Sequence, residues 1–114
     1  MEVLLIYTNL PDKESAESLA AHLVEQRLAA CVTILAPCLS VYRWAGAVEV
    51  ATEVPLMIKS TTATYAALEA AIRARHPYEL PEIVAVSVAR GLPAYLDWVV
   101  NETVAAPNPD ISTC

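Results

Sequence analysis

Two segments of this 114-residue chain are apolar at nearly every position, EVLLIYT (2–8) and EIVAVSVA (82–89). Their β-branched residues favour strands, and an unbroken apolar run is typical of a strand that is buried on both faces. Strict alternation would instead indicate a strand with one face in water. Any fold of this chain must therefore cover both faces of the sheet that holds these two strands.

The residues between these segments predict three more strands. They cover residues 29–35, 40–50 and 53–60. Gly46 is expected to form a bulge or kink within the second of them. Pro55 has no N–H to donate to a sheet, so it is expected on an edge or at the start of the third.

Three helices are predicted from apolar residues that recur at helical spacing. The first begins after Asp12, a capping residue, and ends near Arg27. The second begins after Thr61 or Thr62 and ends before Pro77. The third spans 93–104 and opens with a proline, which the first turn of a helix tolerates.

The resulting order, β-α-β-β-β-α-β-α, contains the split βαβ repeat of a ferredoxin-like sandwich, an α+β fold with helices on one face of an antiparallel sheet. If the helices cover one face, another subunit must cover the other. The pattern therefore predicts an oligomer, and the 56% content of hydrophobic residues agrees with additional buried surface. We expect one domain over residues 1–104 and a C-terminal tail over 105–114.

Charge, hydropathy and cysteine content indicate which partners and which cellular location to expect. The net charge of −6 has the wrong sign for nucleic-acid binding. No apolar run reaches the roughly 20 residues of a membrane span, and the N-terminus lacks a signal peptide's basic region, so we expect no membrane partner. The 3 cysteines form neither a CxxC pair nor an even set, which favours a reducing compartment and hence a cytoplasmic protein.

The stretch RHPYELPEI (75–83) is the strongest candidate for a functional loop. Its two prolines stiffen the connection, and it carries His76, Tyr78, Glu79 and Glu82. A neutral imidazole beside carboxylates can bind a metal. The alternative is a histidine that only favours the end of a helix dipole, and the spacing decides neither.

The aromatic residues and the lysine of the strand region have two interpretations each. Tyr42, Trp44, Tyr95 and Trp98 could line a ligand pocket or serve packing. Lys59 could meet an anion or lie at a solvated strand end. No catalytic residue is assigned, because no Ser-His-Asp order or paired-carboxylate signature occurs and 2 glycines exclude Gly-rich phosphate loops. We therefore expect that the protein is not an enzyme.

Several motifs in one order and spacing resemble the CutA family of divalent-cation tolerance proteins, over residues 2–100. They are TNLPD (8–12), RLAACVTI (27–34), SVYRWAG (40–46), EVPLMIKS (53–60), HPYELPEI (76–83) and YLDW (95–98).

The resemblance implies a ferredoxin-like subunit in a homotrimer similar in assembly to the PII signalling proteins. It also implies tolerance and binding of divalent metals, copper in particular, with His76 and Glu79 as the expected ligands. By motif match, the family's cleft at the subunit boundary would hold Tyr42, Trp44, Lys59, Tyr78, Glu82 and Trp98. A PII-like trimer that binds a small metabolite or a partner protein is the alternative function.

The chain departs from the family at two positions. Ala47 stands where a lysine usually follows the Y-x-W-x-G motif, which removes a possible anion contact. Thr8 stands where some members carry a cysteine proposed as a copper ligand. Because a hydroxyl is a poor ligand for a soft metal, His76 and Glu79 would have to bind with fewer partners or with help from a neighbouring chain.

Overall fold

The computed structural model describes residues 2–103. The chain is an α+β fold whose elements follow the order β1 (Val3–Leu10), α1 (Lys13–Glu25), β2 (Cys31–Ile34), β3 (Cys38–Trp44), β4 (Ala47–Thr61), α2 (Tyr65–Arg75), β5 (Val84–Ser87) and α3 (Pro93–Glu102). The predicted element order and types are confirmed. The predicted tail over 105–114 lies outside the described residues.

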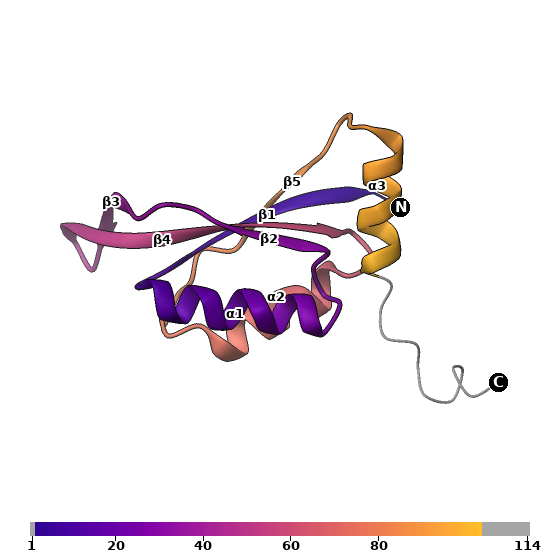
Figure 1. Cartoon of the computed structure of the whole chain (residues 1–114). Coiled ribbons are helices and arrows are strands. Elements are labelled where there is room, and N and C mark those ends of the chain that lie inside the picture. Colours follow the sequence, from indigo (N-terminus) through magenta and orange to yellow (C-terminus); the bar gives the residue numbers. More distant parts are fainter. Residues whose placement is uncertain (1, 104–114) are drawn as a thin grey trace.

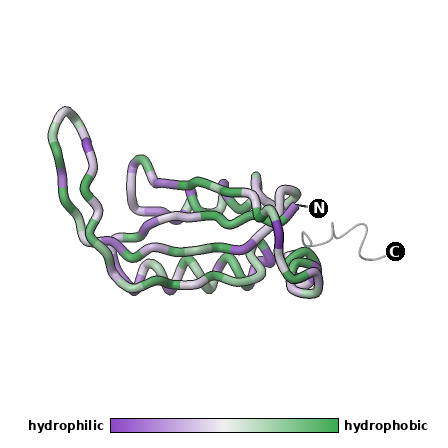
Figure 2. Tube along the Cα trace, turned by 90° about the horizontal axis from the view of Figure 1, so that it is seen from above, coloured by the Kyte–Doolittle hydropathy of each residue, from purple (hydrophilic) through white to green (hydrophobic). Residues whose placement is uncertain are grey.

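The sheet is antiparallel throughout and is organised around β4. One edge of β4 pairs with β1, and β2 and β3 pair with successive parts of β4. The strand order across the sheet is β2-β4-β1-β5, and β3 pairs with β4 outside this order. Helices α1 and α2 lie against one face of the sheet, and α3 stands at one end of it (Figure 1). At the opposite end the β3–β4 hairpin projects beyond the helices (Figure 1, Figure 2).

The core lies between the sheet and the two helices α1 and α2. Its fully buried apolar side chains come from all of these elements: Ile6, Leu10, Leu23, Leu56, Ile58, Leu68 and Ile72. Along β1, buried residues on the helix side alternate with half-buried ones on the other side from Leu4 to Leu10. The helices thus cover one face, as the sequence predicts.

Helix α1 begins as its sequence predicts. The Asp12 carboxylate accepts a hydrogen bond of 2.8 Å from the Ser15 backbone N–H, and this bond lowers the pKa of Asp12. The chain leaves the helix at Arg27, whose φ of 59° turns it toward β2. The Arg27 guanidinium donates a hydrogen bond of 2.7 Å to the Asn101 carbonyl, which connects this turn to the end of α3.

The prediction of one strand over 40–50 with a bulge at Gly46 is wrong. Ala45 (φ 50°) and Gly46 (φ 83°) form a two-residue turn, and Trp44 pairs with Ala47 across it. Positive φ at both central residues is the pattern of a type I′ hairpin turn. The irregularity in strand pairing lies earlier in the chain, between β2 and β3. There the three residues 35–37 lie opposite the two residues 54–55, so the β2–β4 and β3–β4 registers differ by one residue.

Pro55 lies inside β4, not at its start. Its carbonyl accepts a hydrogen bond of 2.9 Å from Leu35 N–H, on the side where β2 has ended and β3 has not yet begun. A residue of an antiparallel strand directs its N–H and C=O to the same side, so the missing N–H falls in this interruption. The proline therefore costs no hydrogen bond of the regular sheet.

Helix α2 begins later than predicted. Thr61 is the last residue of β4, and Thr64 occupies the N-cap position without a side-chain cap hydrogen bond. Its hydroxyl instead donates 2.8 Å to the Thr103 carbonyl, while Thr61 donates to Thr64. Neither of the predicted caps, Thr61 or Thr62, occupies the N-cap position. The helix ends at Arg75, before His76 and Pro77, as predicted.

Strand β5 is not buried on both faces within one chain. Val84 and Val86 are each 48% exposed, and all four residues of the strand are exposed. The burial that its apolar run predicts is therefore absent from the single chain. Within residues 2–103, no helix has the length and hydropathy needed to cross a membrane.

Candidate functional site: a cleft between the β3–β4 hairpin and residues 76–83

His76 holds the start of the loop 76–83 against the end of β1. Its Nε2 lies 2.7 Å from the Asn9 carbonyl oxygen, and its Nδ1 accepts a 3.1 Å hydrogen bond from the Tyr78 N–H. A carbonyl can only accept, so Nε2 carries the proton and donates. His76 is buried, and this burial lowers its pKa, against smaller raising effects of the Asn9 hydrogen bond and the Glu53 charge.

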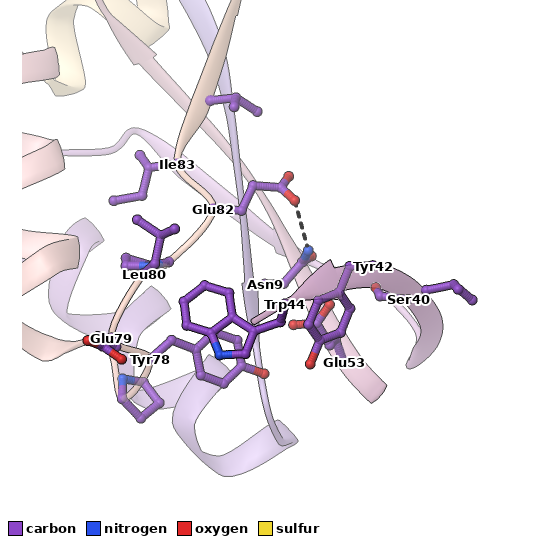
Figure 3. Close-up of a pocket in the computed structure, with 14 residues that line it drawn as sticks. Asn9, Ser40, Tyr42, Trp44, Glu53, Tyr78, Glu79, Leu80, Glu82 and Ile83 are labelled. Carbon is purple, nitrogen blue, oxygen red and sulfur yellow. Dashed lines mark hydrogen bonds between the residues drawn. The ribbon is translucent and has the colours of Figure 1, made fainter. Parts of the chain in front are cut away.

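Asn9 holds the far end of the same loop with its side chain. Its Nδ2 donates to Glu82 Oε1 at 3.3 Å, the bond drawn as a dashed line in Figure 3. One residue of β1 therefore contacts both ends of the loop, through its backbone at His76 and its side chain at Glu82. Prolines 77 and 81 restrict the chain between these two points.

A cleft of about 1020 Å³ lies between this loop and the β3–β4 hairpin. The β1 and hairpin side contributes Asn9, Ser40, Val41, Tyr42, Trp44 and Glu53. The loop contributes Pro77, Tyr78, Glu79, Leu80, Pro81, Glu82 and Ile83, and β5 contributes Val84. Figure 3 shows these side chains gathered where hairpin and loop meet. The cleft combines an aromatic wall with carboxylates.

The innermost acid of the cleft is Glu53, which is only 8% exposed. Burial, together with the nearby Glu53 carboxylate, raises the pKa of Tyr78 to about 12. Tyr78 also packs its ring against His76, with centroids 4.8 Å apart. Tyr78 thus links the buried acid of the hairpin to the histidine of the loop.

Most of the predicted cleft residues come together, and two do not. Tyr42, Trp44, Tyr78, Glu79 and Glu82 line the cleft. His76 lies behind it and reaches it through Tyr78.

Lys59 lies elsewhere on β4, with its Nζ 2.9 Å from Thr33 Oγ1 and 3.8 Å from Cys31 Sγ. Trp98 lies on α3, where it packs against Tyr95 with ring centroids 5.5 Å apart. Helix α3 stands at the opposite end of the sheet from the hairpin (Figure 1).

Sequence reasoning missed Asn9 and Glu53 as site residues. Asn9 belongs to a segment whose local pattern predicts a turn, and Glu53 stands at the start of a predicted strand with nothing to distinguish it. The burial of Glu53 depends on the loop 76–83, so no local signal could have revealed it.

The cleft favours cations. Its lining contains Glu53, Glu79 and Glu82 and neither lysine nor arginine. Carboxylates without nearby positive charges produce a negative potential, which a cleft with low-dielectric walls concentrates. An anionic ligand, expected if Lys59 had faced the cleft, does not suit this lining.

A soft metal would find an incomplete set of ligands in one chain. Within residues 2–103, no group of three or more His, Cys, Asp or Glu side chains is placed to hold a metal ion. Both ring nitrogens of His76 are already engaged in hydrogen bonds. A metal at His76 would have to replace one of these partners, and the nearest exposed carboxylate along the loop is that of Glu79.

Comparison with known proteins identifies the family. The family model described as CutA1 divalent ion tolerance protein matches residues 4–102, nearly all that the structure describes. This chain belongs to the CutA1 family. Among CutA proteins, it is 45% identical over 102 residues to the divalent-cation tolerance protein CutA of Thermus thermophilus, and the match covers 90% of this chain and 97% of that one.

Solved CutA structures share the fold. The Thermus thermophilus structure has a TM-score of 0.87 at 42% identity and covers 89% of this chain and 98% of its own. The Oryza sativa CutA1 structure has a TM-score of 0.89 at 34% identity and covers 93% and 97%. Mouse Protein CutA is 38% identical over 102 residues, which cover 90% of this chain but 58% of that longer protein. This chain therefore spans little more than half of its mouse relative.

Proposed function

We propose that this CutA chain is a non-enzymatic homotrimer that contributes to tolerance of divalent metal ions, copper in particular, by binding them. The family name supports a role in divalent-ion tolerance. The observation that carries the proposal is the cleft, whose lining holds three carboxylates and no lysine or arginine. Such a surface attracts cations and disfavours anionic substrates.

The exposed face of the β3–β4 hairpin supports assembly. Leu39, Val41, Val48 and Val50 project from one face and are 58–67% exposed. Figure 2 shows hydrophobic positions along this projecting hairpin. A contiguous exposed apolar patch of this kind marks a protein interface. We propose that it packs against neighbouring subunits in a trimer similar to the PII proteins, and that β5 is covered in the same way.

The subunit is proposed to be a ferredoxin-like sandwich. The strand order β2-β4-β1-β5 and the two helices on one face support this description. The β3–β4 hairpin is then an extension of the basic fold that carries both the aromatic wall of the cleft and the apolar patch.

His76 and Glu79 remain the proposed metal ligands, with further ligands from a neighbouring chain. The imidazole would exchange its hydrogen bond with Tyr78 N–H or Asn9 O for the metal. Copper favours imidazole nitrogen over carboxylate oxygen, so binding should depend on His76 more than on Glu79.

Calorimetric titration of copper(II) and zinc into chelator-treated protein tests this proposal. The variants are His76→Gln and, as a matched control, His22→Gln on α1, at the chain's other histidine. We expect saturable binding that is lost in His76→Gln and kept in His22→Gln, at a simple ratio per chain or per trimer. Equal binding of the metal by both variants would refute the proposal that His76 is a metal ligand.

A second function is favoured by the size of the cleft. A volume of about 1020 Å³ is at the upper end of the range for small-molecule sites and exceeds what a single ion needs. A signalling or adaptor trimer that binds a small metabolite or a partner protein would use this space. A thermal-shift screen of metabolites tests it, because a ligand of the folded state raises the melting temperature.

We propose a cytoplasmic location, with neither nucleic acid nor membrane as a partner. Cys31 and Cys38 are free thiols, which suits a reducing compartment. The net charge of −6 opposes binding to phosphate backbones.

A further inference from the structure

We infer that the cleft between the hairpin and residues 76–83 binds an aliphatic polyamine, a small organic cation whose ammonium groups are joined by methylene chains. The inference deepens the second candidate function by naming the chemistry of the ligand. It does not depend on metal capture at His76.

The buried acid Glu53 is the first observation. It lines the cleft, is more than nine-tenths buried, and lies near the neutral side chain of Tyr78. Within residues 2–103, no lysine, arginine or histidine forms an ion pair with Glu53 within 4.0 Å. The ion pair found there joins Lys13 to Glu17 on α1. A buried carboxylate without a cation is costly. An ammonium group of a ligand would supply the missing charge.

The aromatic wall is the second observation. Trp44 and Tyr42 line the cleft beside Glu53 and are each 44% exposed, so their rings are accessible to a ligand. Tyr78 completes the wall from the loop side (Figure 3). A cation over the face of a tryptophan or tyrosine is attracted by the ring, most strongly by tryptophan. A carboxylate and aromatic faces together select an organic cation.

The size and the apolar part of the lining distinguish a polyamine from a metal ion. A metal needs several ligands that converge on one point, whereas Glu53, Glu79 and Glu82 are spread around a cleft of about 1020 Å³. Leu80 lies between Glu79 and Glu82 along the loop, and Ile83 follows Glu82. Spaced acids with apolar surface between them match spaced ammonium groups with methylene chains between them.

Calorimetric titration of spermidine into the full chain, in its native oligomeric state and at physiological salt, tests the inference. We expect saturable binding. Trp44→Leu keeps apolar bulk but removes the aromatic face, and should weaken binding about 2- to 30-fold. Glu53→Gln should weaken it at least about tenfold. Glu25→Gln removes the same charge from the exposed end of α1 and should change affinity less than about twofold.

Two further arms keep the test decisive. Glu79→Gln, at an exposed loop position, replaces Glu53→Gln if that variant does not fold, as judged by circular dichroism. Mg²⁺ and the neutral compound 1,8-octanediol are titrated in parallel. We expect neither to reproduce the dependence on both Trp44 and an acid of the cleft.

Four results would overturn the inference. They are no saturable heat with spermidine, equal weakening by Glu25→Gln, binding of the diol as tight as that of spermidine, and Mg²⁺ binding that needs the acids but not Trp44. Spermidine could fail to bind while a metabolite of another class binds in the thermal-shift screen. That result would refute the polyamine inference but would still support the second candidate function.

Discussion

The Nε2 of His76 lies 2.7 Å from the carbonyl oxygen of Asn9, a residue 67 positions earlier in the chain. This bond joins the end of β1 to the loop after α2, two segments that are distant in sequence. With the hydrogen bond from Tyr78 N–H to Nδ1, it defines His76 as a neutral imidazole. The histidine that the sequence singles out as a ligand is therefore also a structural residue.

Protonation of His76 should destabilise the protein. Burial lowers the pKa of His76 below the ordinary value of 6.5, so the neutral form stabilises the fold. That contribution is complete above pH 6.5 and is lost as the pH falls through the lowered pKa of the folded state. Urea unfolding between pH 8 and pH 5 should show a decline that is shallower in His76→Gln and unchanged in His22→Gln. Parallel curves for the parent and His76→Gln would contradict this prediction.

Tyr78 should titrate well above an ordinary tyrosine. Its pKa is raised to about 12, so its neutral form stabilises the fold. This contribution is complete below pH 10 and is lost as the pH rises through about 12. Tyrosinate absorbance should show a late transition whose amplitude falls by one tyrosine in Tyr78→Phe, while Tyr65, whose pKa is also raised by burial, still titrates late. Tyr42→Phe, at a tyrosine on the hairpin wall of the same cleft, should leave the Tyr78 contribution in place. An unchanged amplitude of the late transition in Tyr78→Phe would contradict the assignment.

Replacement of Thr8 by valine should stabilise the protein. Thr8 is fully buried on the core side of β1, and its Oγ1 has no hydrogen-bond partner among the described residues. Thr8→Val removes an unsatisfied hydroxyl from the core at nearly constant volume, which should raise the free energy of unfolding by about 1 kcal/mol.

Thr61→Val is the matched control for Thr8. Thr61 is equally buried, but its hydroxyl donates to Thr64 at 3.1 Å, so its loss should cost about 1 kcal/mol. Urea denaturation measures both. A loss of stability in Thr8→Val would mean that the hydroxyl has a partner, such as an ordered water.

A charge on the apolar face of the hairpin should dissociate the proposed trimer. Val50 is 58% exposed in the single chain and lies directly opposite Val41. Val50→Asp would bury a carboxylate in the interface, which is strongly unfavourable. Light scattering should report single chains for Val50→Asp. The melting temperature of the parent should rise with protein concentration, because unfolding is coupled to dissociation.

Val24→Asp on α1 controls for the charge itself, since Val24 is 43% exposed and lies on a helix away from the hairpin. It should keep the mass of the parent. A trimer that survives Val50→Asp would place the interface elsewhere, whereas a parent of single chains would refute assembly through this face.

Local sequence determined the helices, the antiparallel α+β class and the loop 76–83. Asp12 can cap a helix wherever the chain folds, and Pro77 and Pro93 restrict their own backbones and their neighbours. These effects act within a few residues, so one sequence suffices to read them. For the same reason, Tyr78, Glu79 and Glu82 were recognised together, because a single short loop carries all three.

Tertiary structure decided what shares the cleft with that loop. Strand pairing makes Gly46 a hairpin turn and brings Tyr42, Trp44 and Glu53 to the loop, while Asn9 arrives from β1. Lys59 lies on the same strand as Glu53, but six residues of strand separate them by roughly 20 Å, so it reaches Cys31 and Thr33 instead. The burial of Glu53 and the partners of His76 depend on contacts between distant segments. Local periodicity carries no information about such contacts.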